Sequence, residues 1–274
     1  MSKDIYFFMQ IIRKTKKDDI SSLASQVAYN LLLSFMPFLI FLLTIIGFTP
    51  IKSSEVLPYI RSLMPSEAYA LIKKVIIEIV DTKHSSLLSF SLILTIWSCT
   101  GGVKAIIRAL NKAYEENESR GFFKLQFLSI MFTLGIVLAI FIMIVMLVFG
   151  NTIGIGIENA FNTPLIYNSI WNVLRYVVAI PMLGIISAAI YHFMPCRRLT
   201  WREVLPGTAF STAGWIISAL FFSFYVDNYA NYSRLYGSIA AVFILTAWIY
   251  LEAIILLIGG EINAILTTSS KYSL

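Results

Sequence analysis

The chain has 274 residues, of which 58% are hydrophobic and 13% charged, and its mean hydropathy is +0.79. This composition excludes an ordinary soluble protein and makes membrane lipid the main solvent. The net charge of +6 could attract nucleic acid, but the basic residues cluster at the ends of apolar runs, which is typical of membrane topology. We therefore expect membrane lipids, and no nucleic acid, as partners.

Six apolar segments are long enough to cross the roughly 30 Å of hydrocarbon, which takes about 20 helical residues. They run from 27 to 48, 86 to 105, 125 to 149, 170 to 194, 204 to 226 and 238 to 262. The connections are short, so we predict an all-α fold: a polytopic membrane helical bundle in which residues 1–274 form a single integral membrane domain. The first span has no cleavage site behind it and is expected to be retained.

The basic residues in the flanks predict the orientation of the spans. Fourteen Lys and Arg residues lie on one side of the bundle and six on the other. The positive-inside rule then places both termini in the cytoplasm. Cys99 and Cys196 fall towards the same side, where thiols stay reduced. The fourteen are Lys3, Arg13, Lys14, Lys16, Lys17, Lys104, Arg108, Lys112, Arg120, Lys124, Arg197, Arg198, Arg202 and Lys271, and the six are Lys52, Arg61, Lys73, Lys74, Lys83 and Arg234.

Residues 51–85 form the one substantial segment on the outer side. The segment is too charged to span, yet after Pro65 its apolar residues recur at helical spacing up to Ile79. We predict an amphipathic helix at the outer surface. It serves either as a packing lid over the spans or as an element that senses lipid.

Proline and glycine mark expected helix breaks at Pro37 in the first span, Gly101 and Gly102 in the second, and Pro181 in the fourth. Broken helices line cavities in transporters, and they also occur in ordinary membrane helices. Both interpretations stay open.

Small residues recur along the fifth span at Gly207, Ser211, Gly214 and Ser218, which places them on one stripe. The stripe predicts close approach of another helix. That helix belongs either to the same chain or to a second copy in a homo-oligomer.

Glu252 lies about 14 residues from the outer end of the sixth span, or ~21 Å of helical rise. A carboxylate at this depth is costly unless it is protonated, paired or hydrated. We predict that Glu252 is the transport or coupling residue, with Arg175 of the fourth span as its counter-charge. The alternative is a neutral glutamic acid that only hydrogen-bonds between helices.

Glu261 lies on the opposite face of the same helix, so the two carboxyl groups cannot form an acid/base pair. By depth Glu261 meets Lys104 and Arg108, and we predict an ion pair between the sixth and second spans, with a gate as the alternative. Asn263 and Asn111 lie at a similar depth and are expected to join this structural polar cluster.

Enzyme motifs are missing from the sequence. His84 and His192 fall on opposite sides of the membrane and cannot share a metal, and no P-loop, HExxH or GxSxG motif occurs. We expect no enzyme activity, cofactor or metal.

Six stretches along the chain form an ordered set. Together they resemble the signatures of the YihY/virulence factor BrkB family, some of whose members are labelled ribonuclease BN. The resemblance covers about Ala24 to Leu266, although Gly101 stands where the family motif has arginine and Cys196 where it has asparagine. The stretches are Ala28-Tyr29 with Ser34 and Pro37; Trp97-Ser98 with Gly102 to Ala105; Ala109 to Asn111 with Ala113-Tyr114 and Arg120-Gly121; Pro195 with Arg197-Arg198, Trp201 to Val204 and Pro206-Gly207; Tyr225 with Tyr236 to Ser238; and Leu257 to Ala264.

The resemblance implies six spans and cytoplasmic termini in a bacterial inner membrane, in agreement with the charge count. It also implies a transporter or exporter of lipid, lipid-linked envelope material or another amphipathic substrate. A scaffold for envelope assembly is the alternative, and a membrane-embedded hydrolase comes third. The ribonuclease label finds no support, because the cytoplasmic loops lack a carboxylate or histidine cluster.

Overall fold

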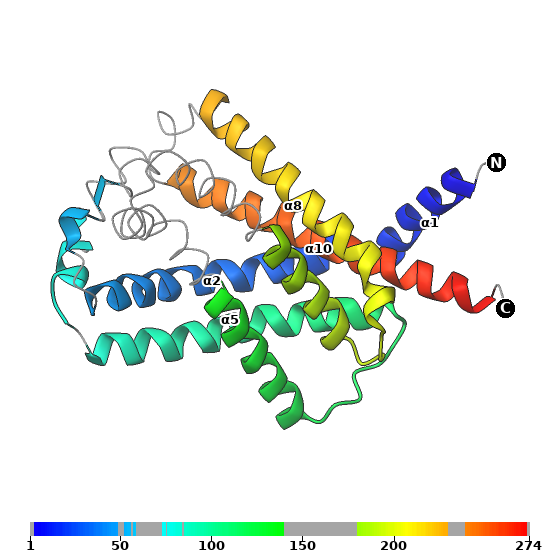
Figure 1. The fold of residues 1–274 in the computed structure, drawn as a ribbon, viewed down its shortest axis with the longest axis horizontal. Helices are drawn as coiled ribbons and strands as arrows, with labels where there is room; N and C mark the ends of the chain where they lie inside the picture. The colour runs from blue at the N-terminus through cyan, green and yellow to red at the C-terminus, as the bar shows by residue number, and fades with distance from the viewer. Residues whose placement is uncertain are drawn as a thin grey trace, which may run out of the picture. The chain divides into compact units, whose positions relative to one another are not determined.

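The computed structural model describes residues 3–48, 52–55, 57–58, 73–74, 76–83, 85–139, 180–229 and 239–272. Within these ranges the chain contains helices and no strand, which confirms the all-α prediction. The labelled helices are α1 (Lys3–Lys17), α2 (Ile20–Gly47), α5 (Ser85–Ala113), α8 (Trp201–Tyr229) and α10 (Ile239–Tyr272) (Figure 1). Two further helices are Phe122–Ala139 and Ile180–Phe193.

Five described segments are long and apolar enough to cross a membrane: Ile20–Gly47, Ser85–Ala113, Phe122–Ala139, Trp201–Phe222 and Val242–Thr268. They correspond to the first, second, third, fifth and sixth predicted spans. The fourth is represented by the shorter helix Ile180–Phe193, because residues 170–179, including Arg175, lie outside the described residues. Several helices extend past the predicted spans, since their ends are too polar to be recognised by hydropathy.

Local sequence signals explain where the helices stop and start. Glu115 has a positive φ of 56°, and Glu116 N donates to Asn111 O at 2.9 Å, which closes the C-terminus of α5 as a Schellman motif. Asp19, with φ of 53°, separates α1 from α2. At the start of α8, Glu203 accepts hydrogen bonds from the backbone N–H and hydroxyl of Thr200, in the pattern of a capping box.

The described residues divide into two compact units, and three of the long helices contribute to both. One unit contains α2, α5 as far as Ile106, and the adjoining ends of α8 and α10, residues 216–254. Here α2 and α5 run antiparallel and side by side (Figure 1). A Cβ atom on Gly101 would clash with the Asn30 side chain, and one on Gly102 would lie 3.3 Å from Leu31 Cδ2. The glycines therefore allow α2 and α5 to pack closely.

The described part of the outer segment packs against the end of α2. Ile76, Ile79 and Val80 are buried, whereas Lys73 and Lys74 are exposed, as an amphipathic helix requires. A Cβ atom on Gly47 would lie 2.8 Å from the carbonyl oxygen of Ile79. This contact favours the packing-lid interpretation for residues 76–83. The preceding stretch 59–72 lies outside the described residues.

The other unit contains α1, the end of α5 from Ile107, the helices Phe122–Ala139 and Ile180–Phe193, and parts of α8 and α10, the latter from Ile255. The α8 stripe packs against α10 in this unit: a Cβ atom on Gly214 would lie 2.6 Å from Ile255 Cγ2. The stripe therefore serves packing within the chain.

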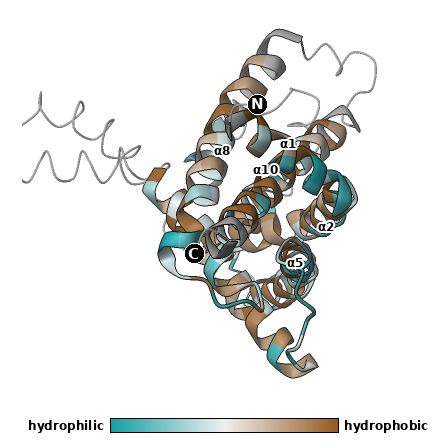
Figure 2. Cartoon of the chain, turned by 90° about the vertical axis from the view of Figure 1, so that its right-hand side faces the viewer, coloured by the Kyte–Doolittle hydropathy of each residue, from teal (hydrophilic) through white to brown (hydrophobic). Residues whose placement is uncertain are grey.

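Brown, hydrophobic residues make up much of the helices drawn in Figure 2. Many large apolar side chains are exposed, among them Ile93 and Trp97 of α5 and Leu220 and Phe221 of α8. Large apolar side chains exposed along long helices are typical of helices that face lipid. The fold is that of a multi-pass membrane protein.

Candidate functional site

Glu252 is held between α10 and α8. Its Oε1 accepts a hydrogen bond from Ser218 Oγ at 2.6 Å, and the side chain is half-buried. One turn away, Phe222 and Trp248 stack with ring centroids 6.0 Å apart, so an apolar contact joins the same two helices. The structure therefore places this carboxyl group within the apolar part of α10, at its contact with α8. Its predicted counter-charge, Arg175, lies outside the described residues.

Glu261 is fully buried, and its ion-pair partner is Lys14 of α1, with Lys14 Nζ 3.3 Å from Glu261 Oε2. The predicted partnership with Lys104 and Arg108 is therefore wrong. The depth argument considered only residues within the spans, whereas Lys14 belongs to a helix that precedes them. Arg108 instead lines a charged hollow.

Lys14 connects the end of α1 to α5 and α10. Its Nζ also contacts Asp18 Oδ2 at 3.2 Å and donates to the carbonyl oxygen of Ala113, the last residue of α5, at 2.6 Å. Its side chain is 19% exposed, compared with 5% for Asp18 and 0% for Glu261. One ammonium group therefore neutralises charge on two buried carboxyl groups and a helix C-terminus, which is negative in the helix dipole.

Asn111 belongs to a separate clamp between two loops. Its Oδ1 accepts a hydrogen bond from the backbone N–H of Cys196 at 2.7 Å, and its Nδ2 donates to Glu118 Oε2 at 3.0 Å. Glu118 also accepts two bonds of 2.8 Å from the Arg120 guanidinium, which in turn donates to Met194 O. The bonds from Arg120 lower the pKa of Glu118 to about 2.

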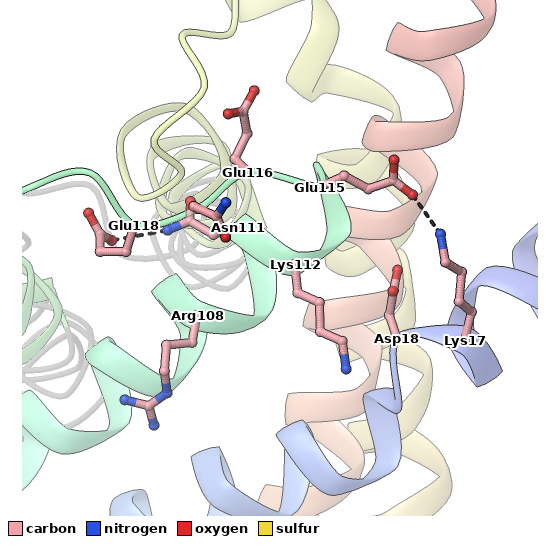
Figure 3. Close-up of a pocket in the computed structure, with 9 residues that line it drawn as sticks. Lys17, Asp18, Arg108, Asn111, Lys112, Glu115, Glu116 and Glu118 are labelled. Carbon is pink, nitrogen blue, oxygen red and sulfur yellow. Dashed lines mark hydrogen bonds and ion pairs between the residues drawn. The ribbon is translucent and has the colours of Figure 1, made fainter.

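A hollow of about 510 Å³ lies beside this clamp (Figure 3). Lys17 pairs with Glu115 at 2.7 Å on its rim, and this exposed pair raises the pKa of Lys17 and lowers that of Glu115. Because the lining mixes both signs of charge, it favours neither anions nor cations. The lining residues are Lys17, Asp18, Arg108, Asn111, Lys112, Glu115, Glu116, Asn117 and Glu118.

Asn263 binds the backbone of α8 and not the Glu261 cluster. Its Oδ1 accepts from Gly207 N at 2.6 Å and its Nδ2 donates to Val204 O at 3.2 Å. The predicted single polar cluster is therefore wrong: Glu261, Asn111 and Asn263 occupy three different bonded groups. Residues at equal depth need not share a face, because successive helical residues are rotated by about 100°.

Tyr191 anchors the short helix Ile180–Phe193 to α8 and α10. Its hydroxyl lies 2.5 Å from Ser211 Oγ and donates to Leu256 O at 2.6 Å, and the residue is fully buried. Gly259 has no side chain to obstruct it, since a Cβ atom there would collide with the Tyr191 hydroxyl. Sequence reasoning missed Tyr191, because a tyrosine at the end of an apolar run is also typical of a membrane interface.

The expected helix breaks are not present at two of the three places. α2 continues through Pro37, and α5 continues through Gly101 and Gly102. Pro181 lies in the described helix Ile180–Phe193, and the residues that precede this helix lie outside the described residues, so the structure does not test a break there. These residues shape packing and do not open the helices described here.

No group of three or more potential metal ligands occurs among the described residues. His192 stacks on Trp201, with ring centroids 4.3 Å apart and planes at 13°. His84 lies outside the described residues. Glu203, an acidic residue in a basic loop, is used to cap α8.

Residues 11–273 match the sequence profile of the family described as virulence factor BrkB. The chain belongs to the virulence factor BrkB family. A Bacillus subtilis protein whose name describes it as ribonuclease-like, YfkH, is 36% identical over 265 residues, which cover 97% of this chain and 96% of that protein. No solved structure matches the chain.

Relatives named UPF0761 membrane protein add to this grouping. The one from Alteromonas mediterranea is 25% identical over 261 residues, covering 91% of this chain and 84% of that protein. The one from Albidiferax ferrireducens is 39% identical over 79 residues, covering 29% of this chain and 19% of that protein. This BrkB family chain is thus similar to proteins that are themselves named as membrane proteins, as its composition predicts.

Proposed function

We propose that this BrkB family protein translocates lipid or lipid-linked envelope material across a bacterial inner membrane, with both termini in the cytoplasm. The observation that carries the proposal is Glu252, a half-buried carboxyl group within membrane-spanning α10, bonded to Ser218 of α8. A proton bound there removes a charge from the hydrocarbon region, and its release restores that charge. The two states differ in free energy, so a proton gradient can bias a conformational change.

The helix contacts around Glu252 fit such a change. Near Glu252, the contacts between α8 and α10 include the Ser218–Glu252 hydrogen bond and the Phe222–Trp248 stack, which are side-chain contacts that can rearrange. By contrast, the other part of this helix pair is locked by close glycine contacts at Gly207 and Gly259. We propose that rearrangement occurs on the Glu252 side.

Nuclease activity is not part of the proposal. The ribonuclease-like name belongs to the YfkH relative. Hydrolysis of RNA usually needs a metal or a general acid/base pair. Among the acidic residues near the basic loops, Glu203 caps α8 and Glu118 binds Asn111 and Arg120.

Lipid translocation can be measured with the purified protein in vesicles that contain fluorescent phosphatidylglycerol. Dithionite reduces only the outer-leaflet fluorophore, so the rate of the second phase reports translocation. We expect the parent to exceed protein-free vesicles when a pH gradient is imposed, and Glu252→Gln to fall to the protein-free rate. The matched control is Glu116→Gln, which neutralises an exposed carboxyl group and should keep the parental rate. Full activity of Glu252→Gln would reject proton coupling, and an inactive parent would favour the scaffold alternative.

The proposed orientation has its own test. Lys73 and Lys112 are both exposed, and the charge count places them on opposite sides of the membrane. In a cysteine-free background, a membrane-impermeant thiol reagent added outside should label a cysteine at position 73 and leave one at position 112 unlabelled. Labelling of position 73 from the cytoplasm alone would reverse the orientation.

A further inference from the structure

The N-terminal helix α1 has two contrasting faces. Lys14, on one face, forms the buried contacts with Glu261 and Ala113. Another face carries Ile5, Phe8, Met9 and Ile12, which recur at spacings of three and four residues and are 53%, 64%, 45% and 43% exposed. One face of α1 thus packs against α5 and α10 of the same unit through Lys14, and another, apolar face is exposed.

Basic residues accompany the exposed apolar face. Arg13 and Lys16 are both exposed, and the last turn of α1 also contains Lys17. Apolar and basic side chains together on one short amphipathic helix are typical of helices that lie in the headgroup region of an anionic leaflet. The apolar residues enter the acyl boundary, while the long basic side chains reach the phosphates.

We infer that α1 is a surface-lying anchor that binds anionic phospholipid in the leaflet on the side of the N-terminus. Two further observations select lipid as the occupant. Only Asp18 and Asp19 separate the end of α1 at Lys17 from the membrane-spanning helix α2, so the C-terminal end of α1 must lie close to the bilayer. Pairing with α1 of a second copy would bring the exposed positive charges of Arg13 and Lys16 close to like charges, which is unfavourable.

The proposed anchor also affects the buried ion pair between Lys14 and Glu261. Because the same helix binds lipid outward and Glu261 inward, its docking on the membrane holds the Lys14 ammonium against the buried carboxylate. The inference does not depend on the proposed lipid translocation, since it concerns a static binding surface on α1.

Depth-dependent quenching of the full-length protein in nanodiscs tests the anchor. A fluorophore is attached to a cysteine at position 9, on the apolar face, or at position 17, on the polar side, in a cysteine-free background. In nanodiscs that contain phosphatidylglycerol, we expect brominated acyl chains to quench position 9 and aqueous iodide to quench position 17. Quenching of position 9 by iodide and not by brominated lipid would overturn the inference.

Two variants separate lipid binding from simple packing. Two basic residues near an anionic surface together favour the docked state by about 30-fold. We therefore expect Arg13→Gln/Lys16→Gln, which retains Lys14, to weaken lipid quenching at position 9, and Phe8→Ser/Met9→Ser, probed at position 12, to abolish it. Quenching equal in phosphatidylglycerol and phosphatidylcholine would remove the role of anionic lipid. A crosslink between position 9 of two copies, with no lipid quenching, would replace the lipid by a second chain.

Discussion

Replacement of Lys14 by methionine should strongly destabilise the protein. The substitution keeps a long side chain of similar volume and removes the ammonium group that contacts Glu261, Asp18 and the Ala113 carbonyl. Glu261, which is fully buried, then has no cation in its ion pair. Breaking a buried ion pair by removing one partner costs roughly 3–5 kcal/mol, which lowers the ratio of folded to unfolded protein by a factor between about 10² and about 4 × 10³.

A cycle of variants attributes this loss to the charge. Glu261→Gln removes the buried negative charge, so it should restore part of the stability that Lys14→Met loses. The control is Lys16→Met, which changes an exposed lysine of the same helix and should stay within about 0.5 kcal/mol of the parent. The assay is the fraction of monodisperse protein that remains after heating in detergent. Equal stability of the Lys14 and Lys16 variants, or no recovery with Glu261→Gln, would refute the reasoning.

Three further predictions concern other groups. Asn263→Ala removes the side-chain partner of Gly207 N and one of two side-chain donors to Val204 O, the other being Thr208, so it should cost roughly 1–3 kcal/mol in the same heating assay, whereas Thr268→Ala should cost much less. Because the pKa of Glu118 falls from 4.5 to about 2 in the folded protein, its stabilising contribution is present above pH 4.5 and is lost as the pH falls towards 2. Acid titration of Glu118→Gln should lack this step, and an unchanged titration would contradict the assignment. The purified protein should leave RNA intact with or without divalent metal, and cleavage that disappears in Glu203→Ala would prove this wrong.

Hydropathy predicted the architecture well, because the bilayer imposes a simple length rule on apolar helices. The family resemblance read from short stretches is confirmed over residues 11–273. The polar ends of the helices were not predicted, because the length rule applies only to residues within the hydrocarbon. It carries no information on the helical turns that extend beyond it. The end of α5 at Ala113 depends on the Schellman bonds of Glu115 and Glu116, which hydropathy does not contain.

Side-chain partners were predicted less well, because depth in the membrane is one coordinate and a contact needs three. Depth placed Glu261, Asn111 and Asn263 together, while rotation about their helices sends them to different neighbours. The Lys14–Asp18 spacing of four residues was visible in the sequence as a helical ion pair. Its link to Glu261 was not visible, since it joins residues far apart in the chain.

The two carboxyl groups of α10 differ in their surroundings, and this difference underlies the proposal that Glu252 is functional. Glu261 is fully buried beside a cation that also holds Asp18 and a helix C-terminus, so any change in its charge disturbs three elements at once. Glu252 is half-buried and bonded to a neutral hydroxyl, so it can gain or lose a proton with less reorganisation of its neighbours. Selection for a proton-coupled step would favour the second environment and not the first. Glutamine should therefore be tolerated structurally at position 252 while removing the proposed coupling.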